Sequence, residues 1–332
     1  MAELEIGVLG AGTWGTALAN LLAGKGYHVD AWSALPEDTE YMATHREHKN
    51  LPGVPISENI TFTANMELAA SGKDLVVFSS PSQYVRSTAA KARPYLAEGQ
   101  LCASVAKGIE RKTFCTMSDI IAEELNGLSP RIVALTGPTF AHEVALGMIS
   151  CILAASTDAE AAREVQEIFG TGWMRVYTSD DPHGAEICGA LKNIIALASG
   201  VATGLGCGDN ARAALITRGL AEIKRLGLAM GCKESTFYGL AGTGDLILTC
   251  TSTQSRNTRA GILIGQGRTA QEACDEVGMV VEGLNVLPAA LELSLAYSVE
   301  MPITQALAAV VSGSIPASDI IDILYARQQK PE

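Results

Sequence analysis

Two charged residues in the second half of the sequence stand in surroundings that do not explain their charge. Lys192 lies in GALKNIIALASG, an alanine- and aliphatic-rich stretch with helical periodicity. A lysine there either extends its ammonium outward to water or is held in a cleft, where an ammonium can serve as a general acid. Asp245 follows a glycine turn in GLAGTGDLILTCTS, where nothing nearby requires a surface charge. Both residues are therefore candidates for chemistry.

A second cluster, SRNTR at residues 255–259, combines a hydroxyl, an amide and two guanidinium groups. At the start of a helix, such a cluster suits an anion such as a phosphate, because guanidinium groups bind phosphate oxygens with paired hydrogen bonds. The same residues could also form a polar helix cap. The sequence leaves both interpretations open.

Three loops of the first half follow predicted strands: SSPSQ (79–83), AKGIE (106–110) and TGPTFAHE (136–143). Lys107 comes directly after an apolar strand, so its ammonium should project over the carboxyl edge of a sheet, although a solvated loop lysine is the alternative. Gly137-Pro138-Thr139 predicts a tight turn into a helix that Thr139 can cap.

The glycine-rich stretch GAGTWG joins an apolar run to an alanine- and leucine-rich helix near the N-terminus. Gly10 permits a tight turn, Gly12 lets the backbone approach a pyrophosphate, and Gly15 lets the helix pack closely on the sheet. The helix N-terminus then offers free N–H groups to phosphates. This spacing alone is a weak signal, because a structural turn without a ligand can show it too. The parallel strands that follow favour a dinucleotide.

The end of the second predicted strand, HVDAWSALPED, distinguishes NAD from NADP in folds of this kind. An acidic residue there binds the ribose hydroxyls, and an arginine binds the extra phosphate of NADP. Asp30 lies mid-strand, too early for the ribose role, and no arginine follows Trp32. The missing cation weakens the case for strict NADP use and favours NAD slightly, with both cofactors left open.

The first half alternates short apolar runs with helical segments, which predicts a doubly wound parallel α/β sheet of the Rossmann type. Both faces of such a sheet are covered, so its strands read as continuous apolar runs. The expected strands are residues 5–9, 27–32, 75–79, 101–106 and 132–136, with further short strands near 61–62, 151–155 and 174–178. Helices are expected from Thr16 and over 84–96, 116–125 and 158–169.

From residue 182 onward almost every segment has helical periodicity. The expected helices run over 183–203, 209–230, 254–266, 269–276, 282–298, 302–312 and 316–326. We therefore predict a dinucleotide-binding domain over residues 1–182 and an all-α substrate domain over residues 183–332. A chain of 332 residues suits two domains, because single cores seldom grow much beyond about 300 residues.

Composition excludes several classes of function. A formal net charge of −12 argues against a nucleic-acid surface. No uncharged apolar run reaches the roughly 20 residues that span a bilayer, which predicts a cytoplasmic protein without membrane insertion. The eight cysteines and five histidines are scattered, without the spacing of metal ligands, so no metal is expected and the thiols should be reduced core residues.

Together these motifs resemble the NAD(P)-dependent glycerol-3-phosphate dehydrogenases. The resemblance covers nearly the whole chain and rests on GAGTWGTALA, LPGV, AKGIE, GPTFA, GALKNIIALASG, NARAALITRGLAE, GLAGTGDLILTCTSTQSRN and VVEG. The long motifs of the second half are far more specific than the glycine loop. The resemblance implies NAD(P)-dependent reduction of dihydroxyacetone phosphate to sn-glycerol 3-phosphate, for phospholipid synthesis, by a homodimer.

The resemblance also implies roles for matching residues, with Lys192 as proton donor and acceptor and Lys107 and Asp245 as further catalytic residues. The implied substrate ligands are Lys107, Gly137, Thr139, Lys192, Asp245, Ser255, Arg256 and Asn257. The implied cofactor contacts are Gly10, Gly12, Thr13, Trp14, Gly15, Lys107, Ala141, Arg256, Val280 and Glu282. Thr13 and Thr139 replace common serines and keep the hydroxyl, whereas Ser33-Ala34 stands where many relatives carry a basic residue.

The expected mechanism places two ammonium groups, Lys107 from the first domain and Lys192 from the second, around one ketone oxygen. Asp245 would orient Lys192, and Arg256 and Asn257 would hold the substrate phosphate. Two alternatives remain at this point. The chain could be a related two-domain β-hydroxyacid or keto-acid dehydrogenase, or a non-catalytic NAD(H) sensor, which would not need the two lysines and Asp245 to converge.

Overall fold

A computed structural model of the chain describes residues 4–326, except for the side chain of Tyr325. The chain divides into two compact units, one comprising Met1–Lys107 with Cys115–Pro182 and the other Gly108–Phe114 with His183–Glu332. The short segment Gly108–Phe114 thus departs from the division at residue 182 that the sequence suggested. Within its own unit it is held by an ion pair between Arg111 Nε and Glu292 Oε1, 3.1 Å apart.

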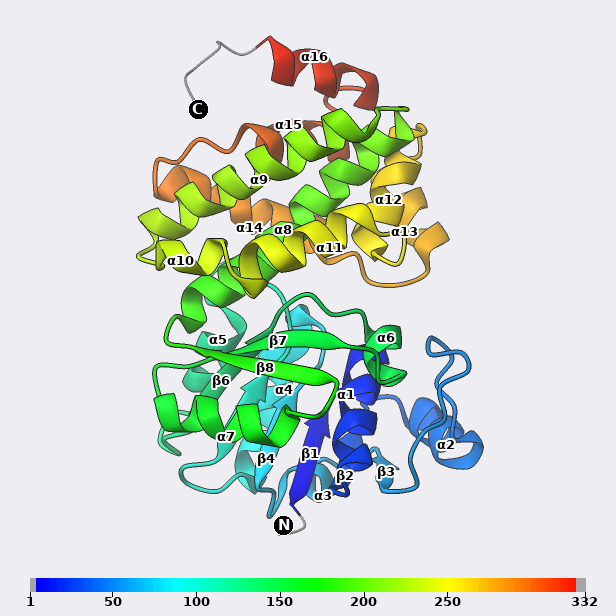
Figure 1. Cartoon of the computed structure of the whole chain (residues 1–332), viewed down its shortest axis with the longest axis vertical. Helices are drawn as coiled ribbons and strands as arrows, with labels where there is room; N and C mark the ends of the chain where they lie inside the picture. Colours follow the sequence, from blue (N-terminus) through cyan, green and yellow to red (C-terminus); the bar gives the residue numbers. More distant parts are fainter. Residues whose placement is uncertain (1–3, 327–332) are drawn as a thin grey trace. The chain divides into compact units, whose positions relative to one another are not determined.

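The described part of the first unit contains an eight-stranded sheet with the order β3-β2-β1-β4-β5-β6-β7-β8 (Figure 1). Its strands are β1 (Glu5–Leu9), β2 (His28–Trp32), β3 (Ile60–Thr63), β4 (Leu75–Phe78), β5 (Leu101–Ser104), β6 (Arg131–Thr136), β7 (Ser150–Ala155) and β8 (Met174–Ser179). Strands β1 to β6 are parallel. The strand order reverses between β1 and β4, and the carboxyl edge at such a reversal is where open α/β sheets bind ligands.

The sequence predicted a parallel sheet, and this prediction is wrong for one pair of strands. Strands β6 and β7 pair antiparallel. The connection between these two strands holds just the five-residue helix α6 (Ala141–Ala145), which is too short to carry the chain back to the amino edge. The chain therefore turns round at the carboxyl edge. Helix α7 (Ala159–Phe169) then provides a full crossover, and β8 runs parallel to β7.

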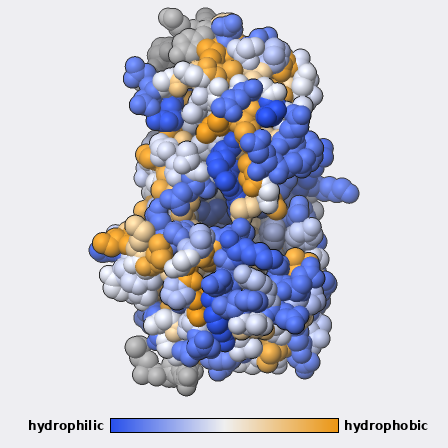
Figure 2. Space-filling view, turned by 90° about the vertical axis from the view of Figure 1, so that its right-hand side faces the viewer, coloured by the Kyte–Doolittle hydropathy of each residue, from blue (hydrophilic) through white to orange (hydrophobic). Residues whose placement is uncertain are grey.

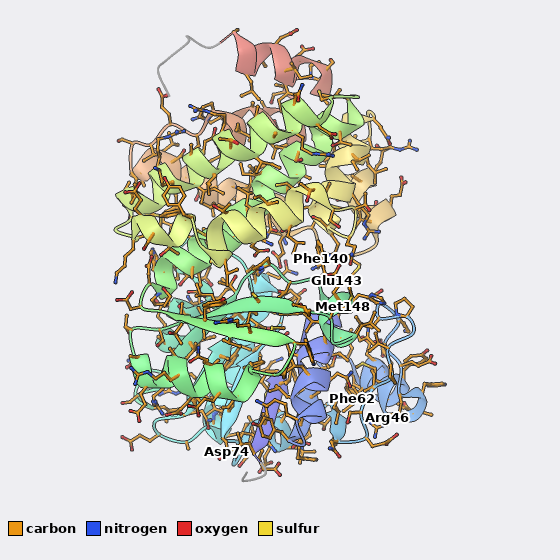
Figure 3. All side chains as sticks on the ribbon, in the orientation of Figure 1. Arg46, Phe62, Asp74, Phe140, Glu143 and Met148 are labelled. Atoms are coloured by element: carbon orange, nitrogen blue, oxygen red, sulfur yellow. The ribbon has the colours of Figure 1, made fainter. Side chains whose placement is uncertain are left out.

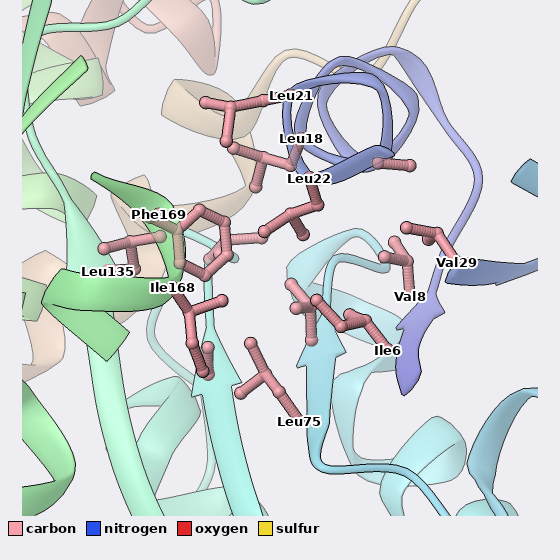
Figure 4. Close-up of a cluster of buried hydrophobic side chains, with 14 of the residues drawn as sticks. Ile6, Val8, Leu18, Leu21, Leu22, Val29, Leu75, Leu135, Ile168 and Phe169 are labelled. Carbon is pink, nitrogen blue, oxygen red and sulfur yellow. The ribbon is translucent and has the colours of Figure 1, made fainter. Parts of the chain in front are cut away.

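Apolar helix faces cover both sides of this sheet. Helix α1 (Thr13–Gly24) and α7 pack on one side, where Leu18, Leu22 and Phe169 meet Ile6 and Val8 of β1 (Figure 4). The other side is covered by α3 (Met66–Ala70), α4 (Val85–Ala92) and α5 (Met117–Glu124). Alternate residues of each strand thus enter different cores, which explains the continuous apolar runs in the sequence.

The second unit is helical. Its helices are α8 (Pro182–Gly204), α9 (Asp209–Ala229), α10 (Glu234–Phe237), α11 (Asp245–Thr251), α12 (Arg256–Gly265), α13 (Ala270–Val277), α14 (Glu282–Ala296), α15 (Pro302–Val311) and α16 (Ile320–Tyr325). Helix α8 lies in the middle of this unit (Figure 1), and every residue from Gly184 to Val201 is buried. The helices α2 (Pro36–His45), α3, α10 and α11 were not predicted. Helices α3, α10 and α11 have five, four and seven residues, too few to show a clear period, and α2 is mostly polar and buries Thr39 and Met42.

Glycines bring α8 and α12 into backbone contact. A Cβ atom at Gly200 would lie 2.2 Å from the carbonyl oxygen of Thr258, and one at Gly261 would lie 2.1 Å from that of Leu197. Gly204 and Gly265 repeat this approach one turn further along. The two helices can therefore pack this closely because neither carries a side chain at these positions, and the contact fixes where α12 begins.

Helix α8 is long and apolar enough to cross a membrane by length and composition, but 89% of its most apolar window is buried inside its own unit. A core helix of a globular protein passes the same test. The face shown in Figure 2 is mostly hydrophilic, with separate hydrophobic patches. All eight cysteines are free thiols; four are buried and four are partly exposed, and burial raises the pKa of Cys102 and of Cys250 to about 12.

Candidate active site

The glycine loop forms a turn at the carboxyl end of β1. The N–H groups of Gly10 and Ala11 both donate to the carbonyl of Trp32, at 2.9 and 2.8 Å, so the loop lies against the end of β2. Gly10 has φ +126°, and a Cβ atom there would lie 2.6 Å from the backbone after β4. A Cβ atom at Gly15 would lie 1.9 Å from the carbonyl oxygen of Gly10. Both glycines are therefore sterically required.

Gly12 differs from the other two glycines, because it is exposed and nothing lies within 4 Å of where its Cβ atom would be. It precedes α1, whose first turn has no side-chain cap and no acidic residue. The first N–H groups of a helix lack intrahelical partners and carry a partial positive charge. Open space, uncapped donors and no competing carboxylate fit a bound pyrophosphate, so the residues present suit a dinucleotide.

Two other predicted cofactor residues lie beside this turn. Thr13 and Trp14 form the start of α1, and Trp14 packs with Ala141 of α6 against a small core of Leu51 and Val54. This contact accounts for the LPGV motif, whose two apolar residues are buried. The structure thus brings together the glycine loop, Trp14 and Ala141 within one unit.

The loops after β5 and β6 meet at the same carboxyl edge. The ammonium of Lys107 donates to the carbonyl of Gly137 at 3.3 Å, and the hydroxyl of Thr139 donates to the same oxygen at 3.3 Å. The prediction that Thr139 caps a helix is wrong, because α6 begins after Phe140 and has no side-chain cap. Its hydroxyl is instead directed back to the turn that Lys107 contacts.

In the second unit, Lys192 and Asp245 form a buried ion pair. Lys192 is in the middle of α8, and its ammonium donates to Asp245 Oδ1 and to Thr249 Oγ1, the latter at 2.6 Å. Asp245 begins α11 and is fully buried, and Thr249 stands one turn later on the same helix. Of the two alternatives for Lys192, extension to water is therefore excluded. A buried ammonium with two fixed acceptors has a defined position and direction.

Asn257 joins three helices. Its amide nitrogen donates to Asn193 Oδ1 at 2.9 Å, and its amide oxygen accepts from the N–H of Gly283 at 2.8 Å. A Cβ atom at Gly283 would lie 2.6 Å from the carbonyl oxygen of Asn193, so glycine is required at this crossing of α14 over α8. Asn257 therefore fixes the start of α12 beside the Lys192 network, and one amide hydrogen remains for a ligand.

Ser255 and Arg256, two other residues of the polar cluster, differ in their surroundings. Ser255 caps α12 by accepting from the N–H of Thr258 at 3.2 Å, as the alternative interpretation of this cluster required. Arg256 is half-buried, and burial lowers the pKa of its guanidinium, partly offset by the carboxylate of Glu282. Glu282 begins α14, and Val280 lies two residues before it. The structure thus places these four predicted residues within one unit.

Two functional candidates were missed by sequence reasoning. Thr249 hydrogen-bonds Lys192, and Asn193 hydrogen-bonds Asn257. A signal existed for both: Thr249 follows Asp245 by one helical turn, and Asn193 is a polar residue within an apolar helix, next to the candidate lysine. Neither signal could show that the two networks come from adjacent positions of α8.

Within the described residues, a possible metal-binding group consists of Glu5, His28 and Asp30, whose ligand atoms lie within 4.8 Å of one another. The ammonium of Lys73 already contacts Asp30 at 2.5 Å and Glu5 at 3.2 Å. Asp74, the next residue, marks this amino edge of the sheet in Figure 3, away from Phe140 and Glu143. The cluster is thus an ion-pair network at the edge opposite the glycine loop.

The chain is similar to known proteins over nearly its whole length. Models of the NAD-dependent glycerol-3-phosphate dehydrogenase N-terminus and C-terminus match residues 5–162 and 181–322. The sequence is 52% identical to an NAD(P)+ glycerol-3-phosphate dehydrogenase of Lactobacillus delbrueckii subsp. bulgaricus, across 99% of this chain and 98% of that protein. It is 48% identical to one of Moorella thermoacetica, across 99% and 97%. The crystal structure of the Coxiella burnetii glycerol-3-phosphate dehydrogenase superposes with a TM-score of 0.94 at 34% identity, across 98% and 99%.

Proposed function

Because this chain belongs to the NAD-dependent glycerol-3-phosphate dehydrogenase family, we propose that it catalyses the reversible reduction of dihydroxyacetone phosphate to sn-glycerol 3-phosphate. The observation that carries this proposal is the buried Lys192–Asp245–Thr249 network. A fixed ammonium is what a carbonyl oxygen needs when it gains negative charge in the transition state.

Lys192 acts as the proton donor in the reductive direction and the acceptor in the reverse direction. A dinucleotide held by the glycine loop at the start of α1 would supply the hydride for the ketone carbon. Asp245 keeps the Lys192 ammonium oriented, and its opposite charge stabilises the charged form of the lysine. Thr249 accepts from the same ammonium, and the two acceptors on α11 together fix its position.

Lys107 adds electrostatic stabilisation to the same oxygen. Its ammonium donates to the carbonyl of Gly137, which places the positive charge at the carboxyl edge of the sheet. A preplaced positive charge needs little reorganisation as the alkoxide forms, which is the main source of electrostatic catalysis. Gly137 and Thr139 then contribute to substrate binding from the same turn.

Arg256 binds the substrate phosphate. Burial lowers the pKa of this guanidinium, which means that the positive charge is poorly solvated and gains from an anionic ligand. Binding the remote phosphate positions the carbonyl against Lys192 and so raises the rate. Asn257 fixes the start of α12 and offers its remaining amide hydrogen, and Ser255 caps the helix.

Initial rates of reduced-nicotinamide oxidation test the proposal with the purified full chain. We expect dihydroxyacetone phosphate to exceed its unphosphorylated analogue dihydroxyacetone by at least about 100-fold in kcat/KM, since a charge-assisted phosphate contact contributes a few kcal/mol. A higher kcat/KM with an unphosphorylated keto acid would instead favour a β-hydroxyacid or keto-acid dehydrogenase. Cofactor binding without turnover on any of these substrates would favour an NAD(H) sensor.

We also propose a setting for the reaction. We place the enzyme in the cytoplasm, as a homodimer that supplies glycerol 3-phosphate for phospholipid synthesis and binds neither nucleic acid nor metal. The net charge of −12 supports the absence of nucleic-acid binding. Size-exclusion chromatography with light scattering tests the dimer, and a monomer at micromolar concentration would contradict it.

A further inference from the structure

The residues after β2 lie beside the glycine loop. The N–H groups of Gly10 and Ala11 donate to the carbonyl of Trp32, the last residue of β2, so Ser33 directly adjoins the phosphate-binding turn. In sheets of this type, the adenosine ribose lies at this point. A 2′-hydroxyl in NAD and a 2′-phosphate in NADP would therefore meet the same few residues.

These residues offer hydroxyl and carboxylate groups. The hydroxyl of Ser33 accepts from the N–H of Leu35 at 3.2 Å and keeps its own hydrogen for donation to a ribose oxygen. Glu37 and Asp38 stand in the first turn of α2, where they offset the partial positive charge of the helix N-terminus. Asp38 has a distant ion pair with Lys49, at 3.9 Å, and Glu37 is exposed. A dianionic phosphate placed here would be repelled.

The nearest guanidinium of this segment is committed elsewhere. Arg46 is the C-cap residue that follows the ten-residue helix α2, roughly 15 Å along the helix axis from its start. It donates to the carbonyl of Ile60 at 2.7 Å and pairs with Glu58 at 3.0 Å, and Figure 3 shows it beside Phe62 of β3. Burial lowers the pKa of the His48 imidazole and so disfavours its charged form.

Asp30 does not replace the missing ribose carboxylate, because it is buried and its charge is compensated by Lys73 at the other edge of the sheet. We propose that this chain selects NAD(H) over NADP(H), through the Ser33 hydroxyl, the lack of a cation at Ser33-Ala34 and the carboxylates of Glu37 and Asp38. This inference rests on the dinucleotide site of the proposed function and names its cofactor.

Titration of the substrate-free protein with NADH and with NADPH tests the inference, with nicotinamide fluorescence as the readout. We expect NADH to bind at least about tenfold more tightly, because like charges at a binding site cost several kcal/mol and tenfold corresponds to about 1.4 kcal/mol. Equal or tighter binding of NADPH by the unaltered protein would overturn the inference, whatever the variants do.

The variants identify the residues responsible. Ala34→Arg should tighten NADPH binding at least about tenfold and change NADH binding little, since it restores a guanidinium beside the turn. Ala34→Gln, similar in length but neutral, and Ala97→Arg, before β5 at the opposite edge, are the matched controls and should leave NADPH binding unchanged. The double variant Glu37→Gln with Asp38→Asn should reduce the difference in affinity between NADH and NADPH. A folded Ala34→Arg protein with unchanged NADPH affinity contradicts the assignment to this turn.

The outcome is separable from that of the proposed function. If the protein binds NADH selectively but does not reduce dihydroxyacetone phosphate, the substrate assignment is wrong and the cofactor inference holds. If the protein binds NADH and NADPH equally tightly and reduces dihydroxyacetone phosphate equally well with both, the cofactor inference is wrong and the substrate assignment holds.

Discussion

Lys192 and Asp245 form a buried ion pair between the middle of α8 and the first residue of α11, with Thr249 as a second acceptor for the ammonium. The two residues are separated by 53 positions in sequence. Burying a charge pair this deeply carries a large desolvation cost. A pair of well-packed hydrophobic residues in its place would often make the fold equally stable or more stable. Its presence is therefore better explained by chemistry at the ammonium than by stability.

Removing the ammonium should abolish most of the activity. Lys192→Ala is expected to lower kcat by at least about 100-fold, because general acid catalysis contributes that much or more. Lys224→Ala is the matched control, since this lysine pairs at the surface with Glu234. Steady-state rates with dihydroxyacetone phosphate measure both. Turnover of a folded Lys192→Ala protein within a few-fold of the original would remove Lys192 from the mechanism.

The same pair predicts a non-additive effect on stability. Lys192→Met leaves the Asp245 carboxylate buried without its partner and should lower the free energy of unfolding by about 3–5 kcal/mol. Adding Asp245→Asn neutralises that carboxylate and should recover much of the loss. Urea denaturation of the single and double variants measures the coupling. If the loss of unfolding free energy in the double variant equals the sum of the losses in the Lys192→Met and Asp245→Asn single variants, the two residues do not act as a pair.

Arg256 and Asn257 are neighbours in the sequence, but their substitution should have different effects. Replacing Arg256 should weaken substrate binding, and replacing Asn257 should lower the stability of the fold. Arg256→Ala is expected to raise KM for dihydroxyacetone phosphate at least about tenfold, because a charge-assisted contact contributes about 1.5–3 kcal/mol. Its stability should change little. Asn257→Ala should lower the free energy of unfolding by about 1–3 kcal/mol, since it leaves Asn193 and the N–H of Gly283 without their partner. An unchanged KM in Arg256→Ala argues against phosphate binding there.

Replacing Gly15 and replacing Gly12 in the glycine loop should impair different properties, the first stability and the second NADH binding. Gly15→Ala forces a Cβ atom against the carbonyl of Gly10 and should destabilise the protein by about 1–3 kcal/mol. Gly12→Ala meets no atom and should leave stability within about 1 kcal/mol, but weaken NADH binding by crowding the pyrophosphate. Urea denaturation and NADH titration compare the two. A Gly12→Ala protein that binds NADH normally would show that the pyrophosphate lies elsewhere.

Glu222 predicts a pH dependence of folding. This buried carboxylate accepts from the N–H groups of Ile303 and Thr304 at the start of α15, at 2.6 and 3.2 Å. Burial raises its pKa above the ordinary 4.5, partly offset by these hydrogen bonds. A raised pKa in the folded state means that the contribution to stability is full below the unfolded pKa and is lost as pH rises through the folded pKa.

Glu222→Gln, which does not titrate, isolates this effect. The free energy of unfolding of the original protein minus that of the variant should fall as the pH rises above 4.5, the ordinary pKa of a glutamate carboxyl. Glu98→Gln, an exposed position, is the control and should give a flat difference. A difference that rises with pH for Glu222→Gln would mean that the hydrogen bonds outweigh burial.

The local features of this protein could be predicted from sequence because they depend on neighbours in the chain. Gly10, Gly12 and Gly15 follow a strand and precede a helix, and the apolar runs of β1 to β6 predict a covered parallel sheet. Lys192 was identifiable because a charge inside an apolar helix conflicts with its surroundings. The family resemblance rested on the same local motifs and is confirmed by both matching family models.

Tertiary structure decided everything that joins distant segments. The reversal of β7 depends on how far the chain between β6 and β7 travels, which no local pattern records. The roles of Thr249, Asn193 and Asn257 arise where α8, α11, α12 and α14 cross, and Thr139 points back to its turn instead of capping α6. Periodicity determines which face of an element is apolar, but packing between elements determines which polar group finds which partner.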